Sequence, residues 1–281
     1  MLKYVRPMLL VWTVVMLAAP ACSRDPKPGS PAAAAEGERL MRQMSDTLAK
    51  VPAFRFSTSE SLETVGPPSE RRVLRFSRTV TVRRPDALYF ELHGAAGTAL
   101  DVAASYDGRT VSLRNDVDRV WAQTEVPGTL DEMLDDVARR YALPVPIADV
   151  IYSVPYEAFI GPKTTGGFAG RETIDGVACA RVAYTDEFVD VGVWIPSSGQ
   201  PLPRRVELVY KRAPGAPKAR MDFTKWDLSP QIADGTFTFA PGGAATQVAF
   251  ADLTAALLAG EHVVARQAPT PEAAPGRATP R

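Results

Sequence analysis

The spacing of apolar residues changes once, close to the start of the folded part of the chain. Between residues 38 and 51 the apolar side chains recur every three or four positions, and they are Leu40, Met41, Met44, Leu48 and Val51. This period predicts an amphipathic helix that Pro52 ends. From Phe54 onward the period becomes two, which is typical of strands with one buried face.

Alternating segments then follow one another, with turn residues between them. Asp107-Gly108 and Asp175-Gly176 predict two-residue hairpin turns, because both dipeptides tolerate positive φ angles. The apolar positions that share a face include Leu74, Phe76, Val80, Val82, Leu88, Phe90 and Leu92, and Phe237 and Phe239 could form a last strand. About 10–11 strands with one-sided alternation predict a mainly β protein with some α structure, built on a single large curved antiparallel sheet.

A helical insertion near residues 129–160 interrupts the strands. Thr129 and Glu132 have the spacing of a capping box, which predicts a helix start. The apolar stripe of this helix contains Leu130, Met133, Leu134, Val137 and Tyr141. Residues 147–152 and 156–160 predict two further helical turns. Because these pieces are amphipathic, we expect their apolar faces to lie on another part of the protein.

The N-terminus has the features of an export signal. A basic start precedes an apolar run of roughly a dozen residues, and Ala19-Pro20-Ala21 provides small residues for cleavage before Cys22. We therefore expect a signal peptide at residues 1–21. The stretch resembles a lipoprotein box, although Ala19 stands where an aliphatic residue is usual. Two interpretations stay open, lipid attachment at Cys22 or plain cleavage that falls before a cysteine.

The segments on either side of the main domain predict little fixed structure. Residues 22–35, rich in Pro, Ser and Ala, have the composition of a flexible linker. Residues 251–281 predict a short helix at 253–258 and a disordered tail rich in Pro and Ala. A single domain over residues 36–250 is the simplest organisation. By analogy with lipoproteins, Ser23 after the cysteine would direct the product to the outer membrane; without acylation the protein would be soluble in the periplasm.

Charge and residue types argue against several functional classes. With 32 basic and 32 acidic residues the net charge is zero, so nothing predicts a nucleic-acid partner. Neither histidine, His93 or His262, has a sequence neighbour that suggests a triad or a metal site. Acidic pairs such as Asp135 with Asp136 have the context of solvated charge, and Cys179 lies in a strand pattern without a nearby histidine. We therefore predict no enzymatic activity, no metal and no cofactor.

Several short motifs resemble one family of predicted periplasmic proteins. They are Thr79-Val80-Thr81-Val82-Arg83-Arg84-Pro85-Asp86, Tyr106-Asp107-Gly108-Arg109-Thr110-Val111, Leu143-Pro144-Val145-Pro146-Ile147-Ala148-Asp149, Thr173-Ile174-Asp175-Gly176-Val177-Ala178-Cys179 and Pro201-Leu202-Pro203-Arg204-Arg205. The resemblance covers about residues 42–250. It implies the fold of the lipoprotein carrier and receptor (LolA/LolB-like), a half-open β-barrel covered by short helices. It supplies no catalytic or binding residues.

An apolar concave face under amphipathic helices is suited to a hydrophobic ligand, a lipid or the acyl chain of an acylated protein. The candidate binding residues are Arg78, Phe76, Val80, Leu88, Phe90, Met133, Leu134 and Val137. An alternative stays equally open, in which the helices complete an ordinary core. The barrel would then be filled by side chains, and the protein would be an interaction or sensor module of the cell envelope. A hydrolytic enzyme is the third hypothesis.

Arg78 breaks the apolar pattern of its strand. It is in phase with Phe76 and Val80, so strict alternation places its guanidinium on the apolar face. A buried arginine needs a carboxylate, backbone carbonyls or a ligand headgroup as its partner. The alternatives are a bulge in the strand or a position at the sheet rim from which the side chain reaches water. If the first interpretation holds and the face is a site, an anionic amphiphile is the expected ligand.

Overall fold

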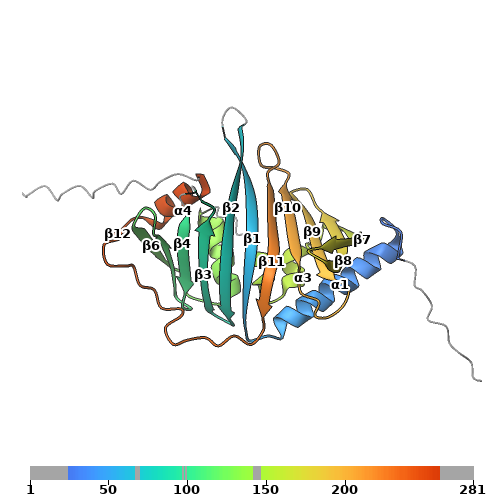
Figure 1. Cartoon of the computed structure of the whole chain (residues 1–281), viewed down its shortest axis with the longest axis horizontal. Coiled ribbons are helices and arrows are strands. Elements are labelled where there is room, and N and C mark those ends of the chain that lie inside the picture. The colour runs from blue at the N-terminus through green and yellow to red at the C-terminus, as the bar shows by residue number, and fades with distance from the viewer. Residues whose placement is uncertain (1–24, 67–69, 97, 99, 142–146, 260–281) are drawn as a thin grey trace, which may run out of the picture.

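One continuous sheet organises the protein. The computed structural model describes residues 25–66, 70–96, 98, 100–141 and 147–259, and within them twelve strands form a sheet in the order β12-β6-β5-β4-β3-β2-β1-β11-β10-β9-β8-β7 (Figure 1). The strands are β1 (Ala53–Gly66), β2 (Glu70–Arg83), β3 (Ala87–Gly94), β4 (Asp101–Tyr106), β5 (Thr110–Asn115), β6 (Val120–Glu125), β7 (Thr165–Ile174), β8 (Val177–Thr185), β9 (Val189–Pro196), β10 (Arg205–Tyr210), β11 (Lys218–Asp227) and β12 (Thr246–Gln247). All neighbours pair antiparallel except β12 with β6. The predicted fold class is confirmed.

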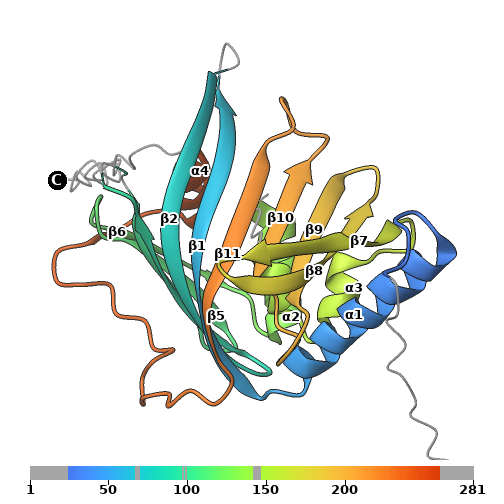
Figure 2. The same ribbon diagram turned by 45° about the vertical axis from the view of Figure 1, so that its right-hand side comes forward.

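The order of the strands explains where the helical insertion lies. Strands β1 to β6 form one meander and β7 to β11 form another, and the two are joined where β1 pairs with β11. Strand β7 is therefore at one edge of the sheet, and β6 is next to the short β12 at the opposite edge. The chain between β6 and β7 must cross from one edge to the other. It does so on the inner side of the curved sheet, as Figure 2 shows.

Five helical segments accompany the sheet. They are α1 (Pro31–Ala49), α2 (Leu130–Tyr141), the 3-10 turn η1 (Ala148–Val150), α3 (Pro155–Phe159) and α4 (Phe250–Ala259). The predicted capping box precedes α2: the Thr129 N–H donates to Glu132 Oε2 at 2.7 Å, and the Glu132 N–H donates to Thr129 Oγ1 at 3.3 Å. No described helix combines the length and the hydropathy needed to cross a membrane.

Helix α1 begins earlier than the sequence pattern indicated, so the expected linker 22–35 is too long. Ser30 caps the helix by accepting a hydrogen bond from the Ala33 N–H at 3.2 Å. Pro31 suits the first turn, and the alanines that follow are the best helix formers. Ala33 is also buried against β7, where Gly37 lies so close to Gly167 that no Cβ would fit. The alanine run is part of the packed domain.

The end of the domain also differs from the prediction. No strand forms at Phe237 and Phe239; instead their rings pack on the convex side, against Arg83 at 4.7 Å and Trp121 at 5.6 Å. Helix α4, expected to lie beyond the domain, buries Phe250 and Leu253 in the main core. Two aromatic side chains favoured a strand by propensity, but contacts with the sheet surface determine their conformation. The domain therefore extends to residue 259.

The main core lies on the concave face. Strands alternate between the two faces, so one side of each strand contributes to this core. Its fully buried side chains include Met41, Met44, Leu48, Phe54, Phe56, Val80, Val82, Val193, Met221 and Phe223. Helix α1 packs against β7, β8 and α3, and it closes one side of the half-barrel.

Candidate functional site

The concave face is divided into two halves that differ in how they are covered. We call the part under α2, η1 and α3 the closed half, and it contains Phe54, Phe56, Val80, Val82 and Leu88, which are at most 6% exposed. We call the part beyond these helices the open half, and it contains Leu62, Leu74, Phe76, Phe90 and Leu92, which are only half-buried. The same alternating strands supply both halves.

The closed half is held at one end of the sheet by hydrogen bonds to the helical insertion. The Leu130 N–H donates to the Pro85 carbonyl at 2.8 Å, and Arg84 Nη2 donates to the Tyr152 carbonyl at 2.9 Å. The Tyr106 hydroxyl donates to the carbonyls just before α2, at 2.8 Å to Val126 and 2.7 Å to Gly128. These contacts fix α2 and η1 over the inner ends of β2 and β3.

The open half arises because two strands are longer than the others. Strands β1 and β2 have 14 residues each, whereas β4, β5 and β6 have six. At about 3.3 Å per residue, the long strands extend well past the helical insertion. Their outer concave positions keep the apolar pattern but lie outside the reach of α2 and α3.

An apolar cavity of about 160 Å³ occupies the open half between the sheet and α4. We call it the α4 cavity. Its apolar lining comes from β1, β2, β3, β4, β5, β11 and α4, and consists of Leu62, Leu74, Phe76, Phe90, Leu92, Leu100, Val102, Leu113, Ala219, Met221, Leu257 and Leu258. Polar groups are few: Glu60 and Arg78 at the sheet, and Ser61 and Arg220 beside them.

Helix α4 covers this cavity with one end only. Its first turns are anchored, because Leu253 and Thr254 are buried and the Phe250 ring packs on Tyr141 at 4.7 Å. Its last turn places Leu257 and Leu258 over the cavity, where both stay half-buried. The helix is therefore firmly packed at residue 250 and loosely packed at the cavity.

Arg78 lies on the concave face, as strict alternation predicted. Strand β2 pairs with β1 and β3 in unbroken register around it, opposite Thr58 and Leu92, so the alternative of a bulge is wrong. The residue is 7% exposed, which also excludes the rim position. Its guanidinium lies between the rings of Phe76 and Phe90, with Cζ at 5.5 and 5.3 Å from their centroids.

A carboxylate on the neighbouring strand is the partner of Arg78. Arg78 Nη2 donates to Glu60 Oε2 at 3.1 Å, and both side chains are buried. Glu60 Oε1 accepts a second hydrogen bond, from the Thr58 hydroxyl at 2.6 Å. The Nε–H of Arg78 is buried and has no hydrogen-bond partner in the described part of the chain. The cavity is therefore lined by a buried ion pair in which the Nε–H of Arg78 has no partner among the described residues.

The eight candidate binding residues do not lie together. Arg78, Phe76 and Phe90 line the α4 cavity. The others belong to the packed core of the closed half and are at most 6% exposed: Val80, Leu88, Met133, Leu134 and Val137. Helix α2 covers its own part of the sheet completely, so its apolar stripe faces strands and not a cavity. Sequence reasoning missed Glu60 and the two leucines of α4. Alternation could have identified Glu60, because it is in phase with Phe54 and Phe56 and is therefore expected on the concave face.

Other groups with possible chemistry have structural surroundings. His93 Nδ1 lies 2.9 Å from Asp101 Oδ1 on the exposed face, and Asp136 pairs with Arg139 and Arg140 on the surface of α2. No group of three potential metal ligands occurs among the described residues. His262 and Cys22 lie outside the described residues.

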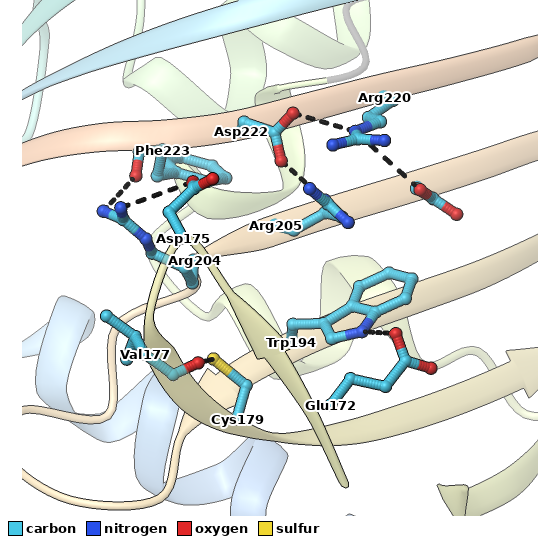
Figure 3. A network of polar contacts seen from close by, with 11 residues as sticks. Glu172, Asp175, Val177, Cys179, Trp194, Arg204, Arg205, Arg220, Asp222 and Phe223 are labelled. Carbon is cyan, nitrogen blue, oxygen red and sulfur yellow. Dashed lines mark hydrogen bonds and ion pairs between the residues drawn. The ribbon is translucent and has the colours of Figure 1, made fainter. Parts of the chain in front are cut away.

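The convex face carries a network of charges around Trp194 (Figure 3). Arg205 Nε donates to Asp222 at 2.5 Å, Arg220 Nε donates to the other oxygen of Asp222 at 2.8 Å, and the Trp194 indole donates to Glu172 at 2.9 Å. Cys179 is fully buried beside this network, and burial raises the pKa of its thiol. Because the thiolate is the reactive form, this environment makes Cys179 inert.

One half-buried carboxyl group lies in the helical insertion. Burial raises the pKa of Asp149 on η1 to about 7. Burial also raises the pKa values of the Tyr152 and Tyr210 phenols; the hydrogen bond to Asp135 adds to the shift of Tyr152, and the Asp149 carboxylate contributes to both. The feature concerns the stability of the closed half.

Comparison with solved structures finds similar chains that share little sequence. The lipoprotein LppX of Mycobacterium tuberculosis is 14% identical, with 70% of this chain and 97% of that chain covered and a TM-score of 0.41. The LolA superfamily protein NE2245 of Nitrosomonas europaea is 13% identical, with 73% and 98% covered and a TM-score of 0.38. LprF of Mycobacterium bovis is 10% identical, with 75% and 99% covered and a TM-score of 0.41.

Sequence comparison identifies a family. No curated protein matches the chain. A family model described as "Predicted periplasmic protein (DUF2092)" matches residues 37–251, which is most of the folded domain. The chain therefore belongs to the DUF2092 family of predicted periplasmic proteins.

Proposed function

We propose that this protein binds a hydrophobic ligand, a lipid or the acyl chain of an acylated protein, in the α4 cavity and without catalysis. The observation that carries the proposal is the apolar cavity of about 160 Å³ between the sheet and α4. Concave and mostly apolar sites with a few polar groups are the usual form of small-molecule sites. The α4 cavity has this form, and its only deeply buried polar side chains in the described lining are Glu60 and Arg78.

The size of the cavity limits what it holds with α4 in place. A dry cavity of about 150 Å³ holds a molecule of the size of benzene. The α4 cavity therefore accommodates several methylene groups at one end of a chain, and the rest of a longer chain would extend past α4. Each buried methylene contributes about 0.8 kcal/mol, so a handful of them supports reversible binding.

A larger ligand requires α4 to move. Only Leu257 and Leu258 of this helix cover the cavity, and both are half-buried. A ligand chain that replaced these two side chains would itself cover the apolar wall formed by residues such as Leu62, Leu74 and Leu92. Because the ligand replaces one apolar cover by another, the free energy needed to move the last turn of α4 away from the cavity stays small.

We also propose that the protein is exported and held at the outer membrane by a lipid on Cys22. The N-terminal pattern supports this location, and the family description agrees with a periplasmic one. Asp25 is ion-paired with Arg171 at 2.8 Å, so three peptide links separate Cys22 from a residue in contact with the domain. A fully extended chain of that length spans about 10 Å. The tether is short, and the domain would lie close to the membrane surface.

Native mass spectrometry of protein purified from its own envelope without detergent tests the binding function. The proposal expects a co-purifying lipid or acyl group, identified after extraction, and its loss from a variant with a blocked cavity. A stable protein partner on a ligand-free domain would favour the interaction module instead. Turnover of an ester library by the pure protein would overturn the absence of catalysis.

The mass of the mature N-terminus tests the anchor. Acylated Cys22 would leave the protein in the membrane fraction, and Cys22→Ala would release it, while Ser23→Ala serves as the matched control. An unmodified Cys22 at the N-terminus would overturn the anchor and leave the proposed ligand site untouched.

A further inference from the structure

The α4 cavity offers its ligand a hydrogen-bond donor without offering a net charge. Arg78 and Glu60 form a buried pair at 3.1 Å, and Arg78 is 7% and Glu60 5% exposed. Arg220, at the edge of the lining, is ion-paired with Asp222 at 2.8 Å, a carboxylate that it shares with Arg205, and with Glu207 at 4.0 Å. The charges of the described lining are therefore balanced before any ligand enters.

The spare donor is the Nε–H of Arg78. Glu60 accepts hydrogen bonds from Arg78 Nη2 and from the Thr58 hydroxyl, and neither of its oxygens forms one with Nε. Nε itself is buried and has no hydrogen-bond partner among the described residues. A buried polar group without a partner costs free energy. Four other arginines of the described residues, Arg84, Arg114, Arg181 and Arg204, also have a buried Nε without a hydrogen bond, but only that of Arg78 lies beside the α4 cavity, where a ligand could supply the acceptor. The side chains of Phe76 and Phe90 on either side of the guanidinium supply none.

The charge balance determines which acceptor fits. A carboxylate or phosphate brought to Nε would meet Glu60 close by in an apolar environment, where repulsion between like charges is strong. An uncharged acceptor meets no such repulsion and still satisfies the donor. This argument rules against the anionic headgroup that the sequence alone suggested for Arg78.

We propose, on the basis of the proposed function, that the α4 cavity selects ligands with an uncharged oxygen acceptor beside an alkyl chain. The carbonyl of an ester or amide-linked acyl chain is such an acceptor. The carbonyl oxygen accepts from Arg78 Nε, and the alkyl part lies among Leu62, Leu74, Leu92 and the two leucines of α4. Glu60 acts as a specificity residue because it excludes anions.

Removal of the negative charge of Glu60 gives the first test. Calorimetry measures the dissociation constants of methyl decanoate and of decanoate for each variant. The ratio of the two constants is then compared between variants. The two ligands differ in hydrophobicity, but this difference is the same for every variant and does not affect the comparison. Glu60→Gln keeps a hydrogen-bonding side chain but leaves Arg78 positively charged and unbalanced. We expect the ratio to shift at least tenfold toward decanoate in Glu60→Gln.

Glu63→Gln is the matched control, because Glu63 is on the same strand and its partner Arg71 is exposed. Its ratio should equal that of the wild type. An unchanged ratio in Glu60→Gln, with both ligands bound, would overturn the inference and leave the proposed function intact. If neither ligand binds the wild-type protein, the proposed function is overturned together with the inference.

A second variant keeps the test independent of the stability of Glu60→Gln. The double variant Arg78→Met with Glu60→Met replaces the pair by apolar side chains, which proteins often tolerate well. The infrared carbonyl stretch of bound, carbon-13-labelled methyl decanoate should lie at lower frequency in the wild type than in the double variant, because only the wild type donates a hydrogen bond. Equal frequencies would contradict the role of Arg78.

Discussion

The closed and open halves of the concave face are made by the same strands but differ in how deeply their apolar side chains are buried. Leu88 and Leu92 illustrate this, because both point inward from β3, four residues apart. Leu88 is 6% exposed beneath the helical insertion, whereas Leu92 lines the α4 cavity and is half-buried. Strand alternation therefore determines which residues face inward, and the covering helix determines whether an inward residue becomes core or cavity wall.

The polar residues of the two halves follow the same division. In the closed half the half-buried carboxyl group of Asp149 has a pKa raised to about 7. In the open half the buried carboxylate of Glu60 has Arg78 and Thr58 as partners. The closed half thus raises the pKa of a carboxyl group that has no ion-pair partner among the described residues, while the cavity contains an ion pair that a ligand can contact.

The buried pair gives the largest expected effect. Glu60→Ala leaves the Arg78 guanidinium buried without a carboxylate, which costs about 3–5 kcal/mol of unfolding free energy. The double variant Arg78→Met with Glu60→Met should recover most of this loss. Urea denaturation measures both. A loss below about 1 kcal/mol in Glu60→Ala would mean that water reaches the pair and that the open half is wet.

Leu88 and Leu92 compare the two halves directly. Leu88→Ala removes a packed core side chain and should cost about 2–4 kcal/mol, while Leu92→Ala should cost less than about 1.5 kcal/mol because its side chain is not fully enclosed. Leu92→Ala should weaken binding of methyl decanoate, and Leu88→Ala should leave the affinity of the folded protein unchanged. Equal losses of stability would contradict the division into halves.

Asp149 gives the closed half a pH dependence. Its pKa is raised from 3.8 to about 7, so between these values the folded protein holds a proton that the unfolded chain has lost. Stability should therefore fall as the pH rises from about 4 to about 7, by up to about 4 kcal/mol, and stay level above that. Asp149→Asn should abolish this slope and be more stable than the wild type at pH 8, as urea denaturation at several pH values would show. If stability fell equally with pH in the wild type and in Asp149→Asn, the assignment of the pH dependence to Asp149 would be wrong.

The last turn of α4 gives the smallest effect on stability. Leu257→Ser should cost about 1 kcal/mol or less because the side chain is half-buried. It should nevertheless speed the release of methyl decanoate several-fold, measured by stopped-flow displacement, since the cavity loses part of its cover. Ala255→Ser, on an exposed position of the same helix, is the control. Equal release rates in the two variants would show that α4 does not cover the ligand.

The sequence predicted most of the fold because the relevant signals are local. Alternation around Phe76 and Val80, the two-residue turn at Asp175-Gly176 and the capping box at Thr129 each act within a few residues, and all three appear in the structure. The other predicted two-residue turn, at Asp107-Gly108, is a longer loop, because Tyr106 pairs with Val111. Arg78 was placed on the correct face for the same reason. Its partner Glu60 was not identified, because that contact depends on the register between β1 and β2.

The division of the site could not be predicted, because it depends on distances along the sheet. The apolar stripe that contains Met133, Leu134 and Val137 predicts that this helix packs on another part of the protein. The stripe does not indicate which part of the sheet the helix covers. The end of the domain was misjudged for a related reason. The leucines of α4 follow a long irregular segment, and only the path of that segment brings Leu257 and Leu258 to the cavity.

The central claim is that the open half, and not the sheet surface in general, binds the ligand. Leu74 and Val73 are adjacent on β2 and lie on opposite faces; Leu74 lines the cavity, and Val73 is 43% exposed on the convex side. The account predicts that Leu74→Trp fills the cavity and lowers the affinity for methyl decanoate at least tenfold, a loss of about 1.4 kcal/mol or more of binding free energy. Val73→Trp should leave the affinity unchanged, with both variants folded by circular dichroism. Equal affinities in the two tryptophan variants would contradict the account.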